Sequence, residues 1–153
     1  MFSRKLTLEL VWWAMTAVIV GVVMFPIWAN FSDFKFNWTN IVFIAAFVTF
    51  TRYAFLLKYT FLADAEKLKI IFVLFTLAIV LAVSTQIQDF NVWLDNGNPD
   101  QLLANSPLAK REKLLNYIKT EFLFFAVAAI MSAVVLGGRL LVSIWRVRNR
   151  GKA

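Results

Sequence analysis

The stretch from Phe122 to Trp145 constrains this chain more than any other part of its sequence. Its residues, FLFFAVAAIMSAVVLGGRLLVSIW, carry a single charge, at Arg139. An α-helix rises about 1.5 Å per residue, so a helix of this length covers the roughly 30 Å of a bilayer's hydrocarbon core. Such a segment is typical of a helix that crosses a membrane.

The composition of the whole chain agrees with a membrane protein. Of its 153 residues, 61% are hydrophobic and 16% are charged, whereas soluble domains have about 45–50% apolar and about 25% charged residues. The absence of Cys and His excludes thiolate catalysis, Cys-based metal sites and the commonest haem ligand. The sequence also lacks a nucleophile motif or a paired-carboxylate site. We therefore expect no cofactor, no metal and no enzymatic activity.

The apolar pattern predicts an all-α fold, an integral membrane four-helix bundle formed by a single domain, 1–153. The expected spans cover about 7–29, 39–57, 68–90 and 121–146. Ser106 and Pro107 form a strong helix start, and apolar residues recur on one helical face after them. We expect an amphipathic outer helix over about 107–120 that leads into the fourth span. It either lies on the membrane surface or continues the span.

Four spans place both termini on the same side of the membrane. Lys and Arg residues are more numerous in the segments on that side, and cytoplasmic loops carry such an excess. We therefore expect a multi-pass protein of the bacterial inner (cytoplasmic) membrane with cytoplasmic N- and C-termini. The net charge of +7 is explained by these segments and by anionic headgroups, so we expect no nucleic-acid partner.

Three charged residues fall inside the expected spans near their inner ends: Glu9, Arg52 and Arg139. A charge in the bilayer costs at least about 2.5–3.5 kcal/mol by insertion scales, so such residues usually pair or face a polar cavity. We hypothesise an intramembrane charge cluster of all three in the inner leaflet. In the alternative, both arginines extend to the lipid headgroups.

Small residues recur at helical spacing along the fourth span, at Ala126, Ala129, Ala133 and Gly137. We call this set the small-residue seam. Small residues three and four positions apart let two helices approach closely in lipid. The seam therefore either packs within the protein's own bundle or contacts another subunit.

The amphipathic helix carries a basic group on the side of the membrane where the topology disfavours positive charge: Lys110, Arg111, Lys113 and Lys119. This local excess suggests contact with acidic lipid headgroups or with a partner. The alternative is an ordinary solvated helix.

These features favour a non-enzymatic membrane protein over a catalyst. The leading hypothesis is an accessory or structural subunit of a larger inner-membrane complex, with membrane lipids and other integral membrane subunits as partners. One alternative is a small homo-oligomeric channel or transporter, although no acidic residue lies near the bilayer midplane, where a relay is expected. A second alternative is a lipid-binding envelope protein. The sequence identifies no small-molecule substrate.

Overall fold

The computed structural model describes residues 4–31, 34–60, 62, 65–97, 103 and 107–149. The described residues form four long α-helices and a short 3-10 helix: α1 (Arg4–Trp28), α2 (Asn37–Leu56), η1 (Leu57–Tyr59), α3 (Glu66–Asp95) and α5 (Leu108–Asn149). All four α-helices are long and apolar enough to cross a membrane. The expected all-α bundle of four spans is therefore confirmed.

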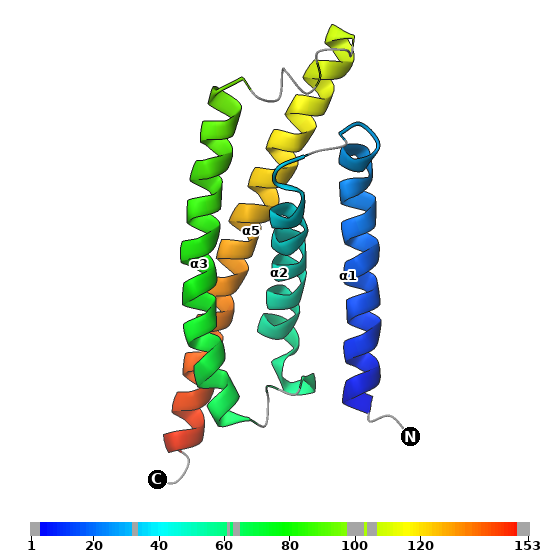
Figure 1. Cartoon of the computed structure of the whole chain (residues 1–153). Coiled ribbons are helices and arrows are strands. Elements are labelled where there is room, and N and C mark those ends of the chain that lie inside the picture. The colour runs from blue at the N-terminus through cyan, green and yellow to red at the C-terminus, as the bar shows by residue number, and fades with distance from the viewer. Residues whose placement is uncertain are drawn as a thin grey trace.

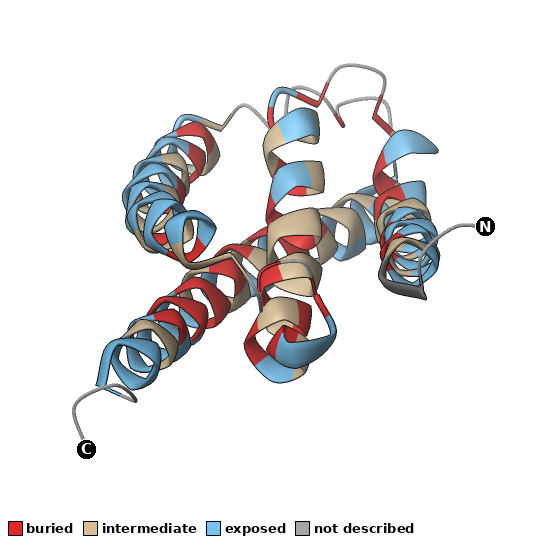
Figure 2. Cartoon of the chain, turned by 90° about the horizontal axis from the view of Figure 1, so that it is seen from below, coloured by how far each residue is buried: buried red, intermediate tan, exposed pale blue. Residues whose placement is uncertain are grey.

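The start of α1 and the end of α5 lie at the same end of the bundle (Figure 1). We call this the terminal end and the other the opposite end. The helices lie side by side, but in cross-section they do not occupy the four corners of a square. Seen from the terminal end, α5 crosses diagonally over the others (Figure 2). It packs mainly against α2 and α3, while α1 packs mainly against α2.

The third helix continues through the polar stretch in which its apolar core ends, and it reaches Asp95. The hydroxyls of Ser84 and Thr85 donate to the carbonyls of Val80 and Leu81 at 2.8 and 3.1 Å. Each hydroxyl thus has its hydrogen-bond partner within the helix and needs none outside it. The helix therefore extends beyond the expected end near residue 90.

The amphipathic lead-in and the fourth span form one continuous helix, α5, of 42 residues. Of the two arrangements left open by the sequence, the structure has the continuation; Ser106 lies outside the described residues. At about 1.5 Å per residue α5 is about 63 Å long, roughly twice the hydrocarbon thickness. Even a tilt of about 40°, the upper end of the usual range, leaves about 48 Å along the membrane normal. Part of α5 therefore extends beyond the hydrocarbon core.

The small-residue seam lies on the face of α5 that is covered by the protein's own helices. Its three alanines are fully buried, and Gly137 is buried as well. A Cβ atom at Gly137 would lie only 3.1 Å from the hydroxyl oxygen of Thr76 on α3. The seam thus serves packing within the bundle, and it leaves no exposed face for another subunit.

An aromatic cluster fills the bundle near its opposite end. The α1–α2 connection contributes three buried phenylalanines that pack on rings from α3 and α5. The rings of Phe90 and Phe122 stack with centroids 3.9 Å apart, and Phe36 meets both edge-on. Each aromatic pair adds about 0.5–1.5 kcal/mol beyond its buried area. The cluster therefore anchors the connection to the helices. Its members are Phe31, Phe34, Phe36, Phe90, Trp93 and Phe122.

Replacing Gly137 with leucine should force α3 and α5 apart where Thr76 faces Gly137. We expect Gly137→Leu to lower the free energy of unfolding by about 1–3 kcal/mol, the usual cost of overpacking. A Cβ atom at the adjacent Gly138 would have no neighbouring heavy atom within 4 Å, so Gly138→Leu is a matched control. Unfolding in detergent followed by circular dichroism measures both. Equal losses in the two variants would contradict this account of the packing.

Candidate functional site

Glu9 and Arg52 form a buried ion pair between α1 and α2 near the terminal end. Their closest oxygen and nitrogen atoms are 2.6 Å apart, and their side chains are only 10% and 6% exposed. The hydroxyl of Tyr53 donates to the second oxygen of Glu9 at 3.4 Å. The guanidinium of Arg52 also lies over the rings of Trp12 and Tyr53, at 5.7 and 5.3 Å. Glu9 and Arg52 thus compensate each other's charge across the two helices.

Helical spacing explains how α1 presents this site. Glu9, Trp12 and Thr16 are three, four and seven residues apart, so they share one face of α1. Thr16 donates its hydroxyl to the carbonyl of Trp12 at 2.8 Å. The Thr16 hydroxyl is thus satisfied within α1 itself. The result is a narrow polar strip on an otherwise apolar helix, turned toward α2.

Arg139 does not join this pair. Among the described residues it makes no ion pair with Glu9, and it is exposed on α5, where it lines a cavity with residues of η1 and α3. The diagonal course of α5 carries its terminal end toward α3 and away from α1 (Figure 1). The expected three-residue cluster is therefore a two-residue pair. The sequence gives how far each of the three residues lies from the end of its helix. It does not give the tilt of α5, which decides whether Arg139 comes near Glu9.

A second buried polar pair lies between α2 and α5 toward the opposite end. The side-chain amide of Asn40 donates to a carboxylate oxygen of Glu121 at 2.6 Å. Asn40 is fully buried and Glu121 is 7% exposed. The remaining oxygen of each side chain has no hydrogen-bond partner in the described part of the chain. The sequence carries no signal for the role of Asn40, because an asparagine near the start of an apolar helix resembles a turn residue.

Two further hydrogen bonds attach α1 to its neighbours near the opposite end. The hydroxyl of Tyr117 on α5 donates to the carbonyl of Val23 at 2.7 Å. The indole N–H of Trp28 donates to the side chain of Asn37 at the start of α2, also at 2.7 Å. Together with the Glu9–Arg52 pair, they hold α1 at both ends.

The basic residues of the amphipathic segment lie on the N-terminal part of α5, at the opposite end. Lys110, Lys113 and Lys119 are exposed, whereas Arg111 is half-buried. These residues are therefore not one uniform patch. The lysines are available to a partner or to lipid headgroups.

Within the residues described, no group of three or more His, Cys, Asp or Glu side chains is placed to hold a metal ion. The Glu9–Arg52 and Asn40–Glu121 pairs each join two helices. Comparison with known proteins gives no match to a family model, a curated protein or a solved structure. The interpretation of the site therefore depends on its geometry.

Removing one member of the Glu9–Arg52 pair should strand the other charge inside the bundle. We expect Glu9→Gln and Arg52→Gln each to lower the free energy of unfolding by about 3–5 kcal/mol. The double variant should lose less than the sum, because it leaves no uncompensated charge. Arg139→Gln serves as the control and should combine additively with Glu9→Gln. Additive effects of Glu9→Gln and Arg52→Gln would show that the pair is not coupled.

Proposed function

We propose that this multi-pass membrane protein is a non-enzymatic accessory or structural subunit of a larger complex in a bacterial inner membrane. The observation that carries the proposal is the length of α5. Its 42 residues exceed what the bilayer requires, so the helix provides a rigid extension outside the hydrocarbon core. The extension at the opposite end bears the exposed Lys110 and Lys113.

The extension is suited to contact with a partner because it is ordered before binding. An isolated helix of about a dozen residues is marginal in water, whereas this one is continuous with a packed span. Lys110 and Lys113 are three positions apart and therefore neighbour each other on the helix surface. An acidic surface on another subunit would complement them. A preorganised contact of this kind has a smaller entropic cost on binding.

The apolar faces of α1 and α3 support the proposal from the lateral side. In the most apolar stretch of each helix, only 17% of the residues of α1 and 11% of those of α3 are buried inside the protein. Lipid covers such faces without cost, and helices of another membrane subunit can replace lipid there by close packing. The protein therefore offers two wide lateral surfaces in addition to the extension.

The subunit proposal predicts a stoichiometric partner that depends on the α5 extension. We expect extraction of the tagged full chain from its native membrane in mild detergent to recover one defined partner, identified by mass spectrometry. Reversing both charges with Lys110→Glu and Lys113→Glu should reduce its recovery. Lys67→Glu, an exposed lysine at the terminal end, is the matched control. Recovery of a lone, monodisperse monomer would overturn the proposal.

The proposed orientation, with both termini in the cytoplasm, is directly testable because the chain has no native Cys. In intact spheroplasts a membrane-impermeant maleimide should label the Lys110→Cys variant. The Arg148→Cys variant should be labelled only after the membrane is permeabilised. Both positions are exposed in the structure, so a difference in labelling reports the side of the membrane. The reverse pattern would mean that the termini face outward.

A further inference from the structure

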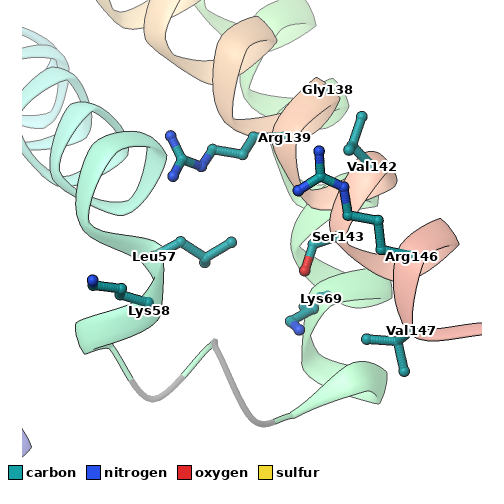
Figure 3. Close-up of a pocket in the computed structure, with 9 residues that line it drawn as sticks. All are labelled: Leu57, Lys58, Lys69, Gly138, Arg139, Val142, Ser143, Arg146 and Val147. Atoms are coloured by element: carbon teal, nitrogen blue, oxygen red, sulfur yellow. The ribbon is translucent and has the colours of Figure 1, made fainter. Parts of the chain in front are cut away.

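A basic cavity opens at the terminal end between η1, α3 and α5. Its volume is about 650 Å³, and four cationic side chains line it together with Ser143 and several apolar residues: Lys58, Lys69, Arg139 and Arg146. No acidic residue is among its described lining. Figure 3 shows that three helical segments contribute these side chains. The cavity therefore concentrates positive charge at the place where three elements meet.

Lys69 is the most informative of the four. It is only 4% exposed, yet its side chain makes no ion pair with any described residue. Burying an ammonium group without a counter-charge is costly. Glu66, one turn earlier on α3, does not compensate it, because the Glu66 carboxylate binds Arg148 at 2.9 Å. An anion inside the cavity would provide a counter-charge that the described residues do not.

The other cations differ in how they face the cavity. The ammonium of Lys58 lies 4.7 Å from the centre of the Tyr59 ring, and in Figure 3 it points away from the other three. Arg139 extends from α5 toward the end of α2, and Arg146 turns back along α5. These arginines are seven residues apart and therefore share one helical face. Lys69, Arg139 and Arg146 thus form the set available to a ligand.

We propose that this cavity binds the phosphate group of an anionic membrane lipid. Arginine and lysine bind phosphate oxygens through charge-assisted hydrogen bonds, and Ser143 adds a hydroxyl. The lining is also partly apolar: Val142 lies between the two arginines along α5 and is exposed, so it can contact the glycerol part of a bound lipid. Basic pockets between membrane helices are suited to anionic headgroups. This site is independent of the proposed partner, which contacts the other end of α5.

The test measures binding of fluorescent phosphatidylglycerol and fluorescent phosphatidylcholine to the purified full chain in neutral detergent. We expect phosphatidylglycerol to bind more tightly, because only it carries a net negative charge. Each lost cation should weaken its binding about fivefold, so the variant with both Arg139→Gln and Arg146→Gln should bind about 25-fold more weakly. Lys67→Gln removes an exposed cation of α3 that does not line the cavity, and this variant should bind as the unchanged protein does.

Lys69→Gln gives a second readout that separates binding from folding. Without lipid, this variant should unfold at the same or a higher temperature than the unchanged protein, because a buried charge is gone. Phosphatidylglycerol should raise the unfolding temperature of the unchanged protein more than that of Lys69→Gln. A lower unfolding temperature without lipid, together with an undiminished lipid effect, would show that Lys69 is structural and would overturn its assignment to the site.

Inorganic phosphate identifies the source of the anion. At matched ionic strength, it should displace phosphatidylglycerol no better than chloride does, because the apolar lining contributes only to lipid binding. If millimolar phosphate displaced phosphatidylglycerol and chloride did not, the assignment to a lipid would be overturned, and the cavity would be a site for free phosphate. Equal binding of the two lipids, or equal losses in Lys67→Gln and in the double-arginine variant, would overturn the site itself.

Discussion

The close approach that α5 allows is the constraint on which the rest of the structure depends. Lipid tails are as apolar as the helix surfaces, so the hydrophobic effect does not drive these helices together, and van der Waals packing must do so. Small side chains from Ala126 to Gly137 let α2 and α3 pack on one helix. At Gly137 even a Cβ atom would lie only 3.1 Å from the hydroxyl oxygen of Thr76 on α3. The diagonal course of α5 then determines which residues meet at each end of the bundle.

Polar groups supplement this packing where the helices have little buried surface. Helix α1 packs mainly on α2, and most of its apolar window is not covered by protein. Its attachment includes the ion pair of Glu9 and Arg52, together with hydrogen bonds from Tyr117 and Trp28. In the bilayer interior a polar group without a partner is costly, so each of these bonds also restricts the orientation of α1.

The sequence predicted much of the fold and less of the site. Long apolar runs identified all four helices, because a membrane-crossing helix must satisfy its backbone internally and cover a known thickness. The sequence could not show that Arg139 lies apart from Glu9, since that depends on the tilt of α5. Nor could it identify Asn40 as the partner of Glu121, since they are 81 residues apart. Nor could the sequence show that Lys69 is buried, since burial depends on how segments far apart in the chain pack together.

The glycine pair that permits the close approach has a mechanical consequence for the end of α5. Each glycine weakens a helix by up to about 1 kcal/mol relative to alanine, and helices bend most readily at such pairs. Gly137 is held against Thr76, whereas a Cβ atom at Gly138 would have no neighbour within 4 Å. Beyond the pair, however, Leu140 is fully buried, and Arg148 binds Glu66 of α3 at 2.9 Å. The weakest point of α5 is therefore clamped on both sides, which keeps Arg139 and Arg146 in register with Lys69.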